Sequence, residues 1–174
     1  MRVVGVNGIN THGVGNIDLV LATMRNRGLE TVDVPIPVRH TWTARWTAKS
    51  DARTVAWLSE DGDIAVCHSR GAHVMHHAHK LREFKAIICI APACSKNLEW
   101  RNPSRVWCYY SPSDWVVRLG SLLPFDHPFG AAGVEGFSQP GTHNYKMHSD
   151  HDDYFDPKTH LGVICDQIWH LGTS

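Results

Sequence analysis

The sequence lacks an excess of charge of either sign. It has 17 Lys and Arg residues against 17 Asp and Glu residues, so its formal net charge is zero when histidine is neutral. Proteins that hold nucleic acid or an anionic membrane by charge carry a basic excess. The balance therefore gives no electrostatic basis for either partner, and we expect no nucleic-acid ligand.

Long apolar runs are also missing. No stretch approaches the roughly 20 residues that a membrane-spanning helix needs. The first residues, MRVVGVNG, enter a strand pattern directly, without the apolar core of a secretory signal peptide. We therefore expect no membrane span and a cytoplasmic location.

The sequence does not have an even number of cysteines. The five residues are Cys67, Cys89, Cys94, Cys108 and Cys165, and most of them lie within apolar runs. This pattern predicts reduced, buried thiols and is not that of a disulfide framework.

Histidine is abundant, with 13 residues that gain charge as the pH falls toward 6.

Apolar runs alternate with stretches of helical spacing along the 174 residues. The expected strands cover residues 3–6, 30–34, 63–67, 84–91, 105–110 and 144–147, and the expected helices cover 16–28, 51–59, 71–82, 115–123 and 161–171. Strands that are apolar throughout and separated by helices predict a mainly parallel sheet with helices on both faces. With no repeat or linker, residues 1–174 are expected to form a single α/β domain, a three-layer sandwich.

One stretch combines a strand, a sharp corner and the start of a helix. It reads Cys67-His68-Ser69-Arg70-Gly71, with the strand before it and the helix after it. A serine at such a corner projects its hydroxyl from the end of the sheet, and the helix N-terminus favours developing negative charge. The pattern resembles the G-x-S-x-G nucleophile elbow of the α/β-hydrolase superfamily, with Cys67 in place of the first glycine. The alternative is a plain strand-to-helix turn with a serine at its apex.

The acid that the resemblance requires has a candidate after the fifth strand. Asp114 follows a Ser-Pro-Ser turn and precedes an apolar helical stretch, as in the acid turn of α/β-hydrolases. A helix N-cap is the alternative role for an aspartate at this place. Asp126 is a weaker candidate because it follows no strand.

The general base has several candidates in the segment THNYKMHSDHDDYFDPKTH, namely His143, His148, His151 and His160. The order Ser, Asp, His along the chain is that of the α/β-hydrolase superfamily. In that superfamily the histidine lies in a loop a few residues past the last strand. If that strand ends at Met147, His151 is better placed than His148, which stays the second candidate.

Backbone N–H groups are expected to form the oxyanion hole. The resemblance implies the amide of Arg70, directly after the serine, and one from the glycine-rich loop after the first strand, at Ile9 or Asn10. Glycines in that loop let the backbone approach a ligand closely. The same loop lacks both common phosphate-binding motifs, so a nucleotide-dependent protein is a distant alternative.

Three other clusters have ordinary explanations. His73 and His77 are spaced i, i+4 on an expected helix, which suits a metal, but no H-E-x-x-H motif accompanies them. The acidic residues between 150 and 156 lack the spacing of a calcium loop, so we assign no metal site. Trp42 and Trp46 can line an acyl pocket, although burial in the core is the commoner fate of such a pair.

The resemblance implies a sheet of six strands in the order 2-1-3-4-5-6 and a minimal core without a cap domain, in which residues 124–141 are the only candidate lid. It implies hydrolysis of an ester, thioester or amide through an acyl-serine intermediate, with Ser69, His151 and Asp114 as a catalytic triad and no cofactor. The expected substrate is a small acyl compound. A binding or scaffold protein with a degenerate elbow is the alternative, and the oligomeric state stays open.

Overall fold

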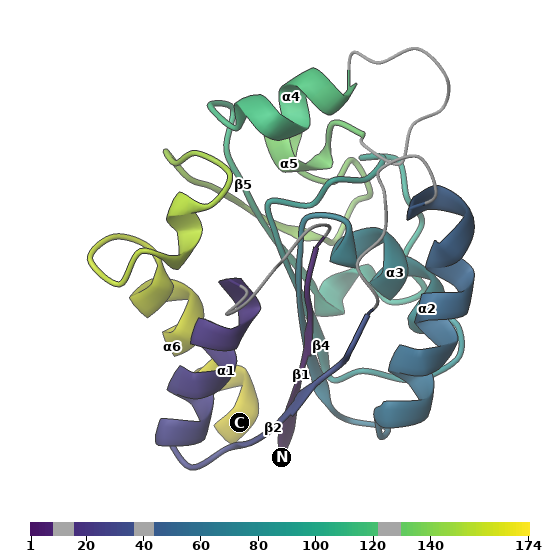
Figure 1. Ribbon diagram of the computed structural model, residues 1–174, viewed down its shortest axis with the longest axis vertical. Coiled ribbons are helices and arrows are strands. Elements are labelled where there is room, and N and C mark those ends of the chain that lie inside the picture. The colour runs from purple at the N-terminus through teal and green to yellow at the C-terminus, as the bar shows by residue number, and fades with distance from the viewer. Residues whose placement is uncertain (9–15, 37–43, 122–129) are drawn as a thin grey trace.

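Six strands form one sheet in which every neighbouring pair is parallel. The structure, a computed structural model, describes residues 1–8, 16–36, 44–121 and 130–174 (Figure 1). The strands are β1 (Arg2–Val6), β2 (Glu30–Asp33), β3 (Ile64–His68), β4 (Ala86–Ile90), β5 (Val106–Tyr110) and β6 (His143–Lys146). Their order is β2-β1-β3-β4-β5-β6, which confirms the predicted topology.

Burial differs sharply between the middle of the sheet and its edges. Every residue of β3 and β4 is buried, as the continuous apolar runs in the sequence predict. The edge strand β6 is exposed along its whole length, and its sequence, HNYK, is polar. The buried strand β3 therefore sits in a rigid environment, and Ser69 follows it directly.

Helices cover the sheet on both faces. They are α1 (Asn16–Asn26), α2 (Ala44–Leu58), α3 (Gly71–Ala78), α4 (Trp115–Ser121), α5 (Ala132–Glu135) and α6 (Leu161–Thr173), with short 3-10 helices η1 (Pro103–Arg105) and η2 (Asp153–Phe155). Figure 1 shows α1 and α6 on one side of the sheet and α2 and α3 on the other. Alternate residues of β3 pack into the two resulting cores: Ala65 and Cys67 into one, Ile64 and Val66 into the other.

Several boundaries differ from the sequence-based expectation. Helix α2 begins at Ala44 instead of residue 51, because its buried alanines Ala48 and Ala52 continue the apolar face toward the N-terminus. Helix α3 ends at Ala78, four residues early, and the following residues form hydrogen-bonded turns. The stretch 124–141, in which no element was predicted, contains the short helix α5.

The expectation for the tryptophan pair was wrong where it can be examined. Trp46 lies on the outer side of α2 and is 77% exposed, so it is not part of the core. Trp42 lies outside the described residues.

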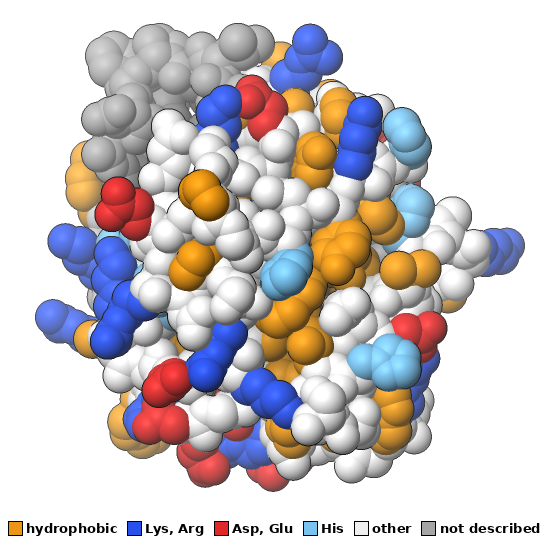
Figure 2. All heavy atoms as spheres, turned by 180° about the vertical axis from the view of Figure 1, so that it is seen from behind, with side chains coloured by type: hydrophobic (Ala, Val, Ile, Leu, Met, Phe, Trp, Pro, Cys, Tyr) orange, Lys and Arg blue, Asp and Glu red, His pale blue; other side chains and the backbone are white. Residues whose placement is uncertain are grey.

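On the face of the molecule in Figure 2, Lys and Arg side chains lie among Asp and Glu side chains. Within the described ranges, no helix has the length and apolar character that crossing a membrane requires.

Candidate active site

Ser69 occupies a strained corner between β3 and α3. Its φ is +53°, a left-handed conformation that is uncommon for a residue other than glycine. Hydrogen bonds hold the corner: the Ser69 amide donates to the carbonyl of Ile90 at 3.0 Å, and the Ser69 carbonyl accepts from Ala72 and Ala93 at 3.2 and 3.0 Å. This is the backbone geometry of a nucleophile elbow.

Small residues make room for that corner. A Cβ atom added at Gly71 would lie 2.5 Å from the carbonyl oxygen of Val6, so no larger residue fits there without a shift of the backbone. Cys67 is fully buried, and its Sγ lies 3.5 Å from both the carbonyl oxygen of Ile88 and the Sγ of Cys89. The cysteine is thus accommodated where the resembling motif has its first glycine.

His151 lies between Ser69 and Asp114. Its Nε2 is 3.2 Å from the Oγ of Ser69, and its Nδ1 is 2.8 Å from the Oδ2 of Asp114. The three side chains come from the corner after β3, the turn after β5 and the segment after β6, which meet at the carboxyl edge of the sheet. Their hydrogen bonds form a continuous path from a hydroxyl through an imidazole to a carboxylate.

Asp114 is fully buried and makes two side-chain contacts at once. Its Oδ1 accepts the backbone N–H of Val117 at 3.0 Å, which caps the N-terminus of α4, while its Oδ2 faces His151. The N-cap reading and the acid reading of this residue are therefore compatible. The capping bond also fixes the carboxylate in the orientation that points Oδ2 toward His151.

Ser111, which the sequence analysis did not single out, joins the acid turn to the histidine segment. Its buried Oγ accepts the backbone N–H groups of Ser113 and Ser149, both at 3.2 Å. The only hint in the sequence was the Ser-Pro-Ser turn, which gave no indication of a partner 38 residues away. This link holds the start of the segment that carries His151.

His148, the second candidate for the base, is exposed. No hydrogen bond or ring contact of His148 occurs within the described part of the chain. The two other histidines of the segment also lie elsewhere: His143 stacks on Trp107 in the sheet, and His160 precedes α6.

Arg70 is the expected oxyanion donor that lies within the described residues. Arg70 follows the serine at the N-terminus of α3, where the helix dipole favours negative charge. Its side chain is 1% exposed and reaches Asp51 and Thr47 of α2, with nitrogen–oxygen distances of 2.5 and 2.8 Å. The other expected donors, Ile9 and Asn10, and the weaker acid candidate Asp126 lie outside the described residues.

Several histidines also lie near one another in and just after α3. The rings of His73 and His77 are 5.1 Å apart, as their i, i+4 spacing dictates. Among the residues that the structure describes, no group of three or more His, Cys, Asp or Glu side chains is arranged to hold a metal ion.

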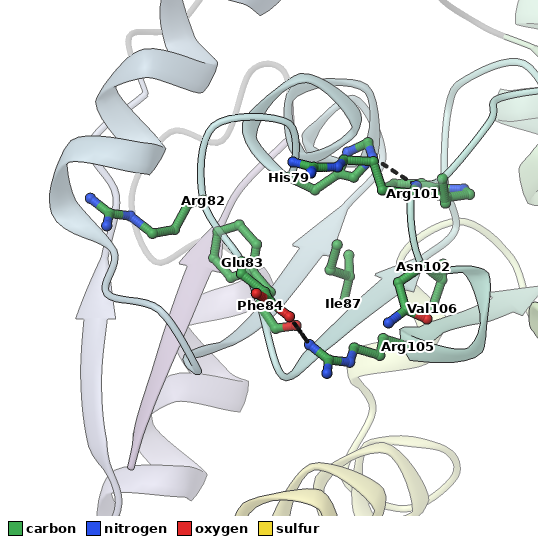
Figure 3. Close-up of a pocket in the computed structure, with 10 residues that line it drawn as sticks. His79, Arg82, Glu83, Phe84, Ile87, Arg101, Asn102, Arg105 and Val106 are labelled. Atoms are coloured by element: carbon green, nitrogen blue, oxygen red, sulfur yellow. Dashed lines mark hydrogen bonds and ion pairs between the residues drawn. The ribbon is translucent and has the colours of Figure 1, made fainter.

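A hollow of about 220 Å³ lies at the opposite edge of the sheet (Figure 3). Phe84, Ile87 and Val106 line it, at the amino ends of β4 and β5, while Ser69 follows the carboxyl end of β3. Two of the charged residues around it pair with each other: a nitrogen of Arg105 lies 2.7 Å from an oxygen of Glu83. This hollow is separate from the Ser69 site.

Comparisons with known proteins identify the fold. No protein-family model and no curated protein sequence matches the chain. Among solved structures, α/β hydrolase domain-containing protein 10 from mouse superposes with a TM-score of 0.64 at 15% identity, over 98% of this chain and 88% of that one. The ydeN gene product of B. subtilis gives 0.64 at 13% identity, over 99% of each chain. A serine hydrolase without a lid from Xanthomonas campestris gives 0.60 at 17% identity, over 98% of this chain and 79% of that one. The resemblance drawn from the elbow sequence is thus confirmed for the architecture, and the chain has the fold of the α/β-hydrolase superfamily.

Proposed function

We propose that the protein is a serine hydrolase that cleaves an ester, thioester or amide through an acyl-serine intermediate. The observation that supports this most directly is the hydrogen-bonded path from Ser69 through His151 to Asp114, with distances of 3.2 and 2.8 Å. Such distances suit proton transfer between a nucleophile and its base. Ser69 also has a strained backbone conformation at the end of a buried strand. Such strain persists only where the surrounding structure enforces it, and strained residues are concentrated at active sites, which supports the proposal.

In this mechanism the Oγ of Ser69 attacks the carbonyl carbon of the substrate while the Nε2 of His151 takes the hydroxyl proton. The Nδ1–H of His151 donates to Asp114, whose negative charge stabilises the imidazolium. The carbonyl oxygen becomes an oxyanion, for which the backbone N–H of Arg70 is one proposed donor. His151 then protonates the leaving group, and a water molecule, activated by the same histidine, releases the acid and restores the serine.

Asp114 contributes by its burial as well as by its charge. The side chain has no exposure to solvent, so its interaction with His151 is weakly screened. The capping bond from Val117 occupies the other carboxylate oxygen and restricts rotation of the group. A fixed, buried carboxylate is what the proposed reaction needs to hold His151 in one tautomer.

A serine-directed fluorophosphonate probe tests the proposal. We expect covalent labelling of the wild-type protein and none of Ser69→Ala, with circular dichroism to show that both are folded. The adduct should map to the peptide that contains Ser69 by mass spectrometry. Absence of labelling on a folded wild-type sample would instead favour the second candidate, a binding or scaffold protein on the same fold.

We further propose that the substrate is a small or exposed acyl compound. This rests on the connections between the strands, in which residues 124–141 are the candidate lid; residues 124–129 of that stretch lie outside the described residues. A series of p-nitrophenyl esters is the test. A preference for acyl chains longer than about ten carbons would contradict this part of the proposal.

A further inference from the structure

His68, the residue before the proposed nucleophile, lies against the segment that carries His151. Its ring is 4.8 Å from the ring of His151, centre to centre, and 5.0 Å from the ring of Phe155, which it meets edge-on. The side chain is only 3% exposed. The last residue of β3 thus fills the space beneath the turn between His151 and Phe155.

One hydrogen bond ties His68 to the main chain of that segment. The Nε2 of His68 is 3.3 Å from the carbonyl oxygen of His151. Because a carbonyl only accepts, the proton of the neutral ring resides on Nε2, and Nδ1 is left as an acceptor. Nδ1 is buried and has no hydrogen-bond partner within the described residues.

The ring of His68 is held neutral by its surroundings. Burial, followed by the charge that His151 can carry, lowers the pKa of His68 to about 3. A neutral ring can lie beside His151 without opposing its protonation. Among the described residues, the carboxylate of Asp114 is then the one charged group that pairs with His151.

We propose that His68 is a positioning residue for His151: its Nε2–H fixes the carbonyl at position 151, and this aims the two ring nitrogens at Ser69 and Asp114. The inference rests on the proposed hydrolase function. It concerns a segment, residues 147–160, in which the only regular element is η2. Contacts from several elements hold that segment near the base: Ser111 meets Ser149, and His68 meets the carbonyl of His151. In addition, the Nδ2 of Asn16 donates to the Oδ1 of Asp152 at 2.6 Å.

The chain provides a matched control in His76. This residue of α3 is also buried, with 7% exposure, and its Nε2 lies 3.1 Å from a carbonyl oxygen, that of Glu99. Burial is likewise the main cause that lowers the pKa of His76 to about 3. It differs from His68 in having no part in the Ser69 site, so it separates positioning from stability.

The test compares His68→Leu and His68→Gln with His76→Leu and His76→Gln. Leucine removes the donor, whereas the amide nitrogen of glutamine can reach the position of Nε2 and donate to the same carbonyl. We measure the second-order rate constant of fluorophosphonate labelling, kcat and KM for a p-nitrophenyl ester, and Tm. Should His68→Leu fail to fold, His68→Phe replaces it, because it fills the site and also lacks the donor.

We expect His68→Leu to lower the labelling rate constant and kcat about 100-fold with little change in KM, since a small misplacement of a catalytic group has this effect. His68→Gln should stay within about fivefold of wild type because the hydrogen bond to the carbonyl is rebuilt. Both His76 variants should react like wild type, even where their Tm falls as much as that of the His68 variants.

The proton NMR signal of the His151 Nδ1–H, which faces Asp114, gives a readout that does not depend on turnover. In His68→Leu this signal should move upfield, because a displaced ring loses part of its hydrogen bond to the carboxylate. A His68→Leu protein with wild-type labelling and an unchanged Nδ1–H signal overturns the inference. Equal losses in Leu and Gln variants that follow Tm also overturn it, in favour of a packing role. If the wild type is unreactive but the signal moves in His68→Leu, the hydrolase proposal fails while the positioning role stands.

Discussion

Two groups of histidines lie on opposite faces of the sheet, His68 with His151 on one face and His76 with His79 on the other, and they differ in their partners. His68 meets Phe155 in the core beneath α1 and α6, while His76 and His79 meet Trp100 in the core beneath α2 and α3. Burial is the largest cause that lowers the pKa in each case, to about 3 for His68 and His76 and about 4 for His79.

The partners decide what each group can do. The Nε2 of His76 faces the carbonyl of Glu99, and that of His79 accepts the backbone N–H of Arg101 at 3.2 Å, a contact drawn in Figure 3. Neither bond offers a carboxylate to support a positive ring or a hydroxyl to activate. His151 has both, in Asp114 and Ser69. A flanking carboxylate and a flanking hydroxyl are what a histidine needs to act as a general base. Burial alone lowers the pKa of the ring and leaves it neutral, as in His76 and His79.

The largest effect is expected from replacing His151, the proposed general base. His151→Ala should lower kcat by about 10⁴- to 10⁶-fold, as Ser69→Ala does, because nucleophile and base act as one unit. The double variant should be no slower than either single one. Steady-state kinetics on a p-nitrophenyl ester provides the measurement.

His148→Ala and His76→Ala are the controls for that experiment, and both should keep most of the wild-type turnover. His148 is exposed, and His76 lies in the other histidine group. If His148→Ala abolished turnover while His151→Ala kept it, the base would be assigned to the wrong histidine.

The next effect tests the carboxylate that distinguishes the two groups. Asp114→Asn should lower kcat by about 10⁴-fold, because the amide cannot hold His151 in the required tautomer or stabilise its charge. The stability should change little, since asparagine also caps helices well. Asp114→Ala should cost a further ~1 kcal/mol in the free energy of unfolding, because the bond to Val117 is lost. Kinetics together with urea unfolding of both variants decides this, and equal stability of Asn and Ala variants would speak against the capping role.

A third change tests the buried ion pair between Arg70, which follows Ser69, and Asp51 of α2. Asp51→Ala removes the carboxylate from this pair and should destabilise the protein by about 3–5 kcal/mol. The matched control is Asp166→Ala, since Asp166 forms an exposed pair with Arg27 and should contribute no more than about 1 kcal/mol. Urea unfolding measures both, and similar small losses would show that the buried pair does not stabilise the corner.

A fourth change concerns the space behind the corner. Cys67→Leu should overpack the fully buried site beside Cys89 and destabilise the protein by roughly 1–3 kcal/mol, with a loss of activity. Cys67→Gly should keep the activity, since glycine is the residue of the resembling motif. Thermal unfolding and ester hydrolysis are the measurements. A Leu variant as stable and active as wild type would mean that the corner is not crowded.

The smallest effect tests whether His68 and His76 are both neutral in the folded protein. A histidine with a folded-state pKa near 3 binds no proton where the unfolded chain does, so the free energy of unfolding falls as the pH drops below about 6.5. Each such residue contributes at most about 1.4 kcal/mol per pH unit over that range. His76→Gln and His68→Gln should therefore each flatten the loss of stability between pH 6.5 and 4.5 in urea unfolding. A slope unchanged in both variants would contradict the neutrality of these rings.

Much of the fold followed from local patterns. The continuous apolar runs predicted the buried strands, and their separation by helical stretches predicted a parallel sheet, because such runs must be covered on both faces. The corner at Ser69 was also legible, since a strand, a small-residue site and a helix start adjoin within five residues. The start of α2 and the exposure of Trp46 were not, because both depend on what packs against one helix.

The site itself shows the limit of local reasoning. Four histidines lie between residues 143 and 160, and their position relative to the last strand favoured His151 without excluding His148. The distances that single out His151 join residues 82 and 37 positions apart. The same holds for Ser111 and His68, whose partners lie in a distant segment of the chain.

Local patterns in the sequence were enough to predict the class of fold, the order of its elements and the corner that presents Ser69. These features depend on periodicity and on residue size over a few neighbouring positions. No local pattern could establish which histidine meets Asp114, which histidines stay neutral or which serine joins the two segments. Those outcomes depend on distances of about 3 Å between side chains from separate strands, and only the packing of the whole sheet sets them.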